Sequence, residues 1–113
     1  MRQSDDLNLL RGTLDLLILK AVAHAPRHGY GVVRWIAEQT GDELQIEDGA
    51  LYTALHRLER RGLLSSKWGM SEAQRRAKFY TMTAKGRRQL EKSESTWNRY
   101  AAAVSNVLTA KPE

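Results

Sequence analysis

The sequence of 113 residues contains no cysteine. This absence excludes a disulfide framework, a cysteine-containing zinc site and a thiol nucleophile, and it suits a protein of the reducing cytoplasm. The sequence also lacks a long hydrophobic run. Its longest apolar stretch, residues 14–23, is interrupted by Asp15 and Lys20, whereas a membrane-spanning helix needs about 20 apolar residues. We therefore expect a cytoplasmic protein with no membrane partner.

No arrangement of catalytic residues stands out either. The sequence has no Ser, His and Asp order typical of a nucleophilic triad, no pair of carboxylates that would share a pocket, and no glycine-rich phosphate loop. His24 and His28 have a spacing that binds metal on a helix, but Pro26 lies between them and no third ligand is suitably spaced. We expect a protein that is not an enzyme and that holds no cofactor and no metal.

What the sequence does contain is a globular composition with unevenly distributed charge. Hydrophobic residues make up 42% and charged residues 27%, which predicts one compact unit that folds along most of its length. The net charge is +5, but residues 56–88 hold ten Lys or Arg against two acids, and the rest of the chain is net negative. This concentration favours a local surface for a polyanion, with a solvated charged face as the alternative.

Apolar residues at helical spacing predict two helices in the first third of the chain. The apolar stripe of the first helix spans residues 10–22. Thr13 or Asp15 lies near the start of this helix, and Pro26 ends it. The second has its apolar stripe at residues 32–37 and closes where Gly41 can supply a left-handed turn. Both helices are expected to face a common core.

A third helix is predicted from Asp48, as its N-cap, to Gly62, after a brief strand over residues 44–46. Its apolar residues lie on one face: Leu51, Ala54, Leu55 and Leu58. Steps of about 100° per residue place a polar set on the other face and its flanks: Gly49, Tyr52, Thr53, His56, Arg57 and Arg60. One side of this helix is therefore expected to pack, and the other to display donors and cations.

The second half of the sequence predicts a basic hairpin followed by a long helix. Residues 63–68 and 78–82 are rich in β-branched, aromatic and aliphatic residues, with Arg75 in the stretch that connects them. Thr83 then caps a helix that extends to about Leu108.

Leu90, Trp97 and Val104 repeat every seven residues along that helix. Such a seam needs a partner, and a second subunit is the simplest one. The alternative is that the helix folds back over the first helix of the same chain.

This order of elements is that of a winged helix-turn-helix, in which the third helix enters the major groove and the hairpin is the wing. We expect a mainly α fold with a small β-hairpin wing. Residues 1–82 would form the DNA-binding domain, and residues 83–109 the C-terminal dimerisation helix of the same compact unit.

Three separated blocks carry a resemblance over about residues 8–108. HGYGVV at 28–33, GALYTALHRLERRGLL at 49–64 and KFYTMTAKGRRQL at 78–90 resemble the PadR family. The resemblance implies a homodimeric winged-helix repressor of the small subtype, which has a single C-terminal helix. It also implies that aromatic residues of that helix stack, in some members, on flat hydrophobic inducers.

Residues 50–53 read Ala-Leu-Tyr-Thr where the family commonly has Ser-Leu-Tyr-Pro, so a hydroxyl replaces a rigid proline. The operator sequence is expected to differ accordingly. The wing has Ser-Glu-Ala-Gln at 71–74, so the geometry of its tip does not follow from the resemblance.

We predict that one set of residues contacts double-stranded operator DNA: Tyr30, Asp48, Gly49, Tyr52, Thr53, His56, Arg57, Arg75, Arg76 and Lys78. Within it, Tyr52 donates to a phosphate, Thr53, His56 and Arg57 meet base edges, and the wing cations follow the backbone or reach the minor groove. The alternatives are that Tyr52 is a core edge and Tyr30 is structural.

A second predicted set forms the dimer and ligand interface: Leu90, Trp97, Tyr100, Ala101, Val104 and Leu108. Trp97 either stacks on a small aromatic or hydrophobic inducer or simply fills the seam as an anchor. The sequence thus favours a sequence-specific repressor that binds DNA as a homodimer. A winged-helix protein-interaction module with an acidic partner is the alternative.

Overall fold

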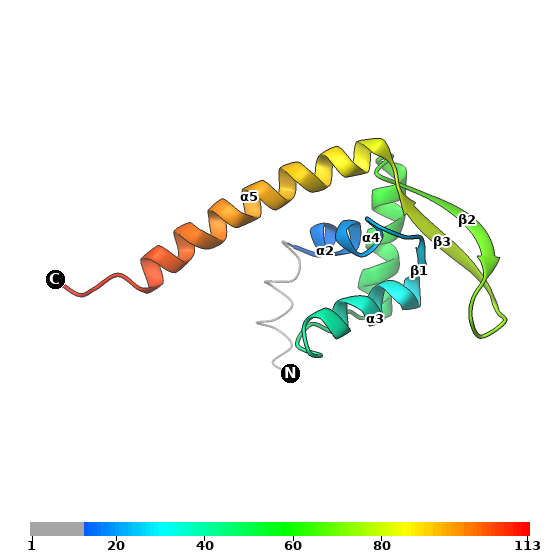
Figure 1. Ribbon diagram of the computed structural model, residues 1–113, viewed down its shortest axis with the longest axis horizontal. Coiled ribbons are helices and arrows are strands. Elements are labelled where there is room, and N and C mark those ends of the chain that lie inside the picture. Colours follow the sequence, from blue (N-terminus) through cyan, green and yellow to red (C-terminus); the bar gives the residue numbers. More distant parts are fainter. Residues whose placement is uncertain (1–12) are drawn as a thin grey trace.

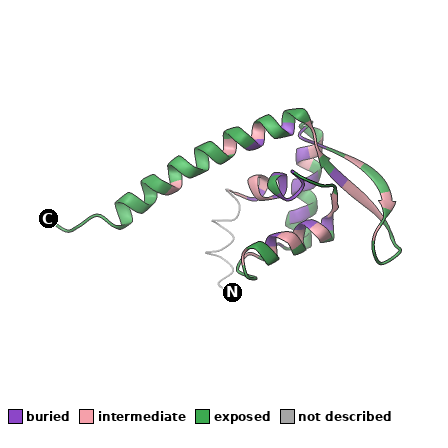
Figure 2. Cartoon of the chain, viewed as in Figure 1, coloured by how far each residue is buried: buried purple, intermediate pink, exposed green. Residues whose placement is uncertain are grey.

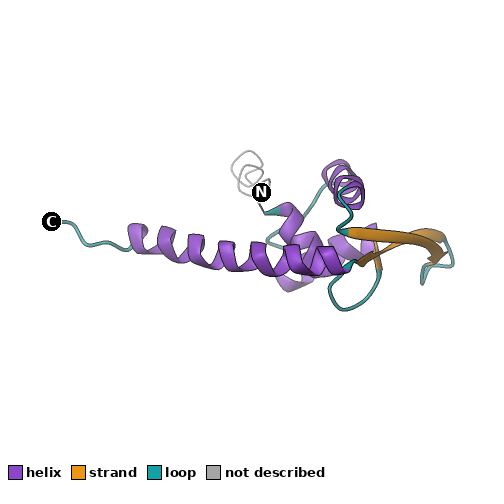
Figure 3. Ribbon diagram, turned by 90° about the horizontal axis from the view of Figure 1, so that it is seen from above, coloured by secondary structure: helices purple, strands orange, loops and turns teal. Residues whose placement is uncertain are grey.

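The computed structural model describes residues 13–113, which are mainly helical with one small sheet. In chain order the elements are α2 (Leu14–Ala21), β1 (Arg27–His28), α3 (Gly29–Gln39), α4 (Asp48–Arg60), β2 (Leu64–Met70), β3 (Arg76–Met82) and α5 (Ala84–Leu108). Helices α2, α3 and α4 pack together, and the hairpin and α5 extend from them in opposite directions (Figures 1 and 3). The predicted winged helix with a long last helix is confirmed. Leu10, which was expected in the first helix, lies outside the described residues.

Local signals set most helix ends where the sequence predicts them. Gly41 and Gly62 both adopt a left-handed conformation, with φ of +57° and +77°, directly after α3 and α4. The prediction for the start of α4 is wrong by one residue. Glu47 occupies the N-cap position without a side-chain hydrogen bond, and Asp48 is the first helical residue, where its charge favours the helix dipole.

The sheet is antiparallel, with strand order β1-β3-β2. The wing hairpin β2–β3 pairs Leu64 with Met82 at its base and Met70 with Arg76 near its tip. The strand predicted over residues 44–46 is wrong, because this segment has no strand partner and instead places Leu44 and Ile46 against the core. The free edge of β3 is taken by β1, whose two residues are too few to show alternation.

The core lies between the three packed helices, the base of the hairpin and the start of α5. Its fully buried side chains include Ile18 of α2, Ile36 of α3, Leu55 of α4 and Tyr80 of β3. In Figure 2 burial is concentrated in these elements, whereas most of α5 is exposed. Within residues 13–113 no helix combines the length and the apolar character that crossing a membrane requires.

The start of α5 is fixed by contacts with the end of α4. Thr83 caps α5 as predicted: its Oγ1 accepts a hydrogen bond from Gly86 N at 3.0 Å and donates to Gly62 O at 2.7 Å. The N–H of Thr83 donates to Leu63 O at 3.1 Å, and Lys85 Nζ donates to Arg61 O at 2.8 Å. These bonds set the direction in which α5 leaves the wing.

Candidate nucleic-acid interface

Helix α4 separates apolar and polar residues onto two faces, as its sequence predicts. The four apolar residues of its buried face, Leu51, Ala54, Leu55 and Leu58, are each at most 1% exposed. Gly49, Thr53, His56 and Arg60 are exposed on the opposite face. We call these four the polar stripe of α4. It offers a hydroxyl, an imidazole and a guanidinium on a helix backed by the core.

Tyr52 lies on the flank of α4 nearest to the beginning of α3. Its ring contacts Gly29 so closely that a Cβ built on Gly29 would lie 2.8 Å from the Tyr52 hydroxyl oxygen. The side chain is 44% exposed, so it is a core edge on one side and open on the other. His28 caps α3, because its Nδ1 accepts a hydrogen bond from Gly31 N at 3.0 Å. The Tyr52 hydroxyl is therefore beside a helix N-terminus, where partial positive charge favours an anion.

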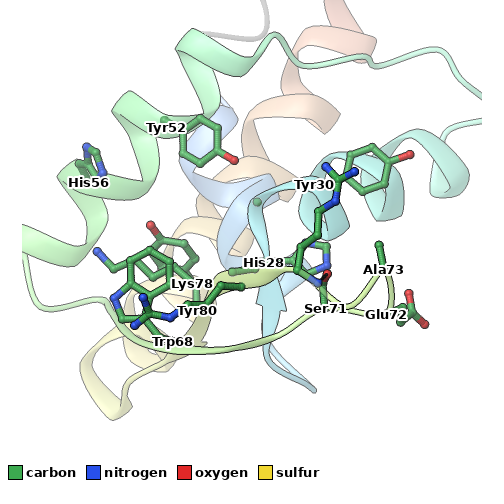
Figure 4. Close-up of a pocket in the computed structure, with 14 residues that line it drawn as sticks. His28, Tyr30, Tyr52, His56, Trp68, Ser71, Glu72, Ala73, Lys78 and Tyr80 are labelled. Atoms are coloured by element: carbon green, nitrogen blue, oxygen red, sulfur yellow. Dashed lines mark hydrogen bonds between the residues drawn. The ribbon is translucent and has the colours of Figure 1, made fainter.

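A groove of about 770 Å³ separates α4 from the wing. Figure 4 shows Tyr52 and His56 on the α4 side, Trp68, Lys78 and Tyr80 on the wing side, and Tyr30 from α3. Arg75 and Arg76 also line the groove. The structure thus brings together Tyr30, Tyr52, His56 and all three predicted wing cations, although they lie far apart in the sequence.

The wing cations differ in how far they are neutralised. Arg75 is exposed beside a turn in which Ser71 N donates to Arg75 O at 2.8 Å. The guanidinium of Arg76 lies 4.7 Å from the centre of the Trp68 ring, a cation–π contact that orients it. Lys78 Nζ lies 3.8 Å from Glu59 Oε1, so part of its charge is neutralised within the chain. Among the described residues, neither arginine has a carboxylate partner.

Glu59 has a role in the site that was not predicted from the sequence. Its Oε2 accepts a hydrogen bond from Ser66 Oγ at 2.6 Å, while Oε1 faces Lys78, so it joins α4 to both wing strands. Burial raises the pKa of the neighbouring Tyr80 phenol, and the charge of Glu59 acts in the same direction. Tyr80 therefore stays neutral where the helix meets the wing.

The guanidinium of Arg57 is paired with Asp15 of α2. Its Nη2 donates a hydrogen bond to Asp15 Oδ1 on α2, and Arg61 Nη1 lies 3.8 Å from Oδ2 of the same carboxylate. The sequence predicts that Arg57 meets base edges, and it does not reveal the contact with Asp15, because the two residues are 42 positions apart. Asp48 lies exposed at the beginning of α4.

The candidate residues of α5 fall into two groups. Leu90 is only 5% exposed and belongs to the core of its own chain, so it must be removed from the predicted intermolecular seam. Ala101 is half-buried. The other apolar residues form an exposed stripe that also includes Val107: Trp97, Tyr100, Val104, Val107 and Leu108. We call these five the α5 stripe.

No group of three possible metal ligands occurs in residues 13–113. His28, one of the two histidines with metal-binding spacing, is used instead to cap α3.

Comparison with known proteins places this geometry in a family. The protein-family model described as "Transcriptional regulator PadR-like family" matches residues 18–92. A PadR family transcriptional regulator from Eggerthella lenta DSM 2243 has a structure with a TM-score of 0.80 at 33% identity, over 96% of this chain and 92% of that one. A transcriptional regulator from Clostridium thermocellum gives a TM-score of 0.79 at 25% identity, over 88% and 96%. An uncharacterized protein of Lysinibacillus sphaericus is 28% identical over 90 residues, which are 80% of this chain and 83% of the relative.

Proposed function

Because the chain belongs to the PadR-like family of transcriptional regulators, we propose that it binds double-stranded operator DNA as a homodimeric repressor in the cytoplasm. It is a transcriptional regulator and not an enzyme. The observation that carries the proposal is the groove that places Tyr52 and His56 of α4 opposite Arg75 and Arg76 of the wing, two arginines without a carboxylate partner among the described residues.

This arrangement supports a division of work on a duplex. The polar stripe enters the major groove, where Thr53 and His56 reach base edges. Tyr52 donates its hydroxyl to a phosphate next to the N-terminus of α3. Arg75 and Arg76 follow the backbone on the other side of the groove, where they add affinity that is independent of sequence.

The α5 stripe supports the homodimer. Five large apolar side chains on one face of an exposed helix are seldom left in water, and a second copy of the same helix would cover them. Two subunits joined in this way would read a pseudo-palindrome whose half-sites are about 34 Å, one helical turn, apart.

The proposal also includes a small-molecule inducer that binds at α5. Trp97 is 43% exposed in the α5 stripe, and a small aromatic or hydrophobic compound would stack on it between the two subunits. Such a compound releases DNA only if it binds the DNA-free arrangement of the dimer more tightly. Unchanged operator affinity across a panel of aromatic compounds, phenolic acids included, would remove the inducer from the proposal.

The function is tested by measuring binding to the promoter region of the protein's own gene and to a scrambled duplex, at about 50 and 200 mM salt. A repressor binds the promoter more tightly, and its affinity falls steeply as salt rises. Equally weak binding to both duplexes would favour the alternative, a protein-interaction module whose basic face meets an acidic partner.

Tyr52→Phe is expected to weaken binding to promoter and scrambled duplex alike, by about tenfold, because one hydrogen bond to a charged phosphate is lost. The ring that packs on Gly29 is retained, so the melting temperature should not change. Fluorescence anisotropy titrations measure the effect, with Ser95→Ala, which removes an exposed hydroxyl of α5 outside the α5 stripe, as the control. Unchanged affinity would make Tyr52 a core-edge residue only.

Val104→Glu is expected to convert the dimer into monomers, because it places a charge in the apolar seam between two copies of α5. Sedimentation equilibrium reports the mass, and circular dichroism verifies the fold. Asn106→Glu introduces the same charge on the opposite side of α5 and should leave the dimer intact. A Val104→Glu protein that remains dimeric would show that another surface joins the subunits.

A further inference from the structure

Asp15 contacts two arginines at the far end of α4. It lies in the first turn of α2, where one carboxylate oxygen accepts a hydrogen bond from Arg57 and the other lies 3.8 Å from Arg61 Nη1. Arg57 and Arg61 are one helical turn apart, so a single carboxylate holds two cations of the DNA-binding element. This ion pair joins α2 to α4, and the sequence pattern of neither helix predicts it.

This ion pair differs from a fully solvated surface pair. The three side chains are between 35% and 50% exposed, and the Arg57 contact includes a hydrogen bond. A pair that is only partly exposed is screened less by salt than a fully solvated one.

The ion pair with Asp15 involves an arginine that lies next to the polar stripe of α4. Steps of about 100° per residue place Arg57 on the flank directly beside Thr53 and Arg60 of the polar stripe. On the opposite flank of α4, Glu59 forms an ion pair with Lys78 of the wing. Between the two flanks Arg60 is exposed and has no side-chain partner in the part of the chain that the structure describes.

We propose that Asp15 sets the DNA specificity of this regulator by holding Arg57 and Arg61 away from phosphates. The inference rests on the proposed function. A free arginine beside the polar stripe would reach a phosphate of any sequence and stabilise non-specific complexes. The operator complex would be stabilised less, because base contacts already fix the position of α4 on the duplex. Asp15 therefore widens the difference between operator and other DNA.

Asp15→Asn tests this inference, since it removes the charge and keeps the shape. We expect affinity for scrambled duplex to rise about threefold to tenfold. The log–log salt dependence should steepen by about 0.9 for each additional phosphate that a released arginine neutralises. Affinity for the operator should rise less, so the ratio of operator affinity to scrambled-duplex affinity should fall. Glu94→Gln on α5 removes the same charge far from α4 and should change neither quantity.

Two further variants show whether the arginines carry the effect. In an Arg57→Gln background, Asp15→Asn should have a much smaller effect on scrambled duplex. Arg57→Gln/Arg61→Gln alone should leave the salt dependence at the wild-type value, because both cations are already withheld. This second variant also serves if Asp15→Asn does not fold.

The inference is overturned if a folded Asp15→Asn protein keeps the wild-type salt dependence, if Glu94→Gln acts equally, or if Arg57→Gln/Arg61→Gln makes the salt dependence shallower. Absence of DNA binding by the unmodified protein is a different result. It would overturn the proposed function, and with it the role of Asp15.

Discussion

Arg75→Ala/Arg76→Ala is expected to weaken binding to operator and to scrambled duplex by a similar factor, about 100 for the pair at low salt. Both arginines lie on the groove between the wing and α4, and neither has a carboxylate partner among the described residues. Their charge is therefore available to phosphates. Because no base is read by these contacts, the preference for operator should remain while total affinity falls.

The salt dependence gives the sharper measurement. Loss of two phosphate contacts should reduce the slope of log affinity against log salt by about 1.8. Lys92→Ala/Lys111→Ala removes the same charge from the exposed side of α5 and from the tail, and should reduce it far less. Equal effects of the two double variants would mean that only net charge matters, and that the wing does not lie on the backbone.

Arg76 allows charge to be separated from orientation within the same experiment. Arg76→Lys keeps the cation but removes the planar group that lies over Trp68. We expect its slope to match the wild type and its affinity to fall by a few fold. That outcome would show that the Trp68 contact aims the cation at the backbone.

Periodicity predicted the helical part of the fold because each buried stripe recurs several times. Leu51, Ala54, Leu55 and Leu58 all fall on one face, so the opposite polar stripe of α4 followed directly. Helix ends were predicted where one residue decides them, as with the positive φ of Gly62 and the cap formed by Thr83. The two-residue β1 has no period and could not be found in this way.

Tertiary contacts explain what the sequence did not predict in the candidate site. Asp15 and Arg57 are far apart in the chain, and a formal charge does not indicate its partner. Leu90 and Trp97 occupy the same heptad position, yet only Leu90 lies where α2 and the core of the same chain cover α5. The heptad repeat predicts an apolar seam along α5. It does not predict which turns of α5 are buried against the same chain.

Gly86→Ala is expected to destabilise the protein by about 3 to 5 kcal/mol, although alanine normally favours a helix by up to about 1 kcal/mol over glycine. Gly86 is buried in the first turn of α5. A Cβ there would lie 2.1 Å from the carbonyl oxygen of Leu63 and 2.9 Å from Met82 Cγ. The oxygen belongs to the backbone, so α5 must move away. That movement would break the hydrogen bond from the Thr83 N–H to the same oxygen and disturb the Thr83 cap.

Thermal unfolding followed by circular dichroism measures this effect, and a fall in melting temperature of roughly 15 °C is expected. Gly49→Ala is the matched control, because it makes the same substitution in the first turn of α4, where nothing lies within 4 Å of the added Cβ. It should leave stability unchanged or raise it slightly. A Gly86→Ala protein as stable as Gly49→Ala would contradict the close contact between α5 and the end of α4. That contact fixes the angle between α5 and α4, so, if α5 joins two subunits as proposed, a folded Gly86→Ala protein should also lose affinity for operator half-sites at the wild-type spacing.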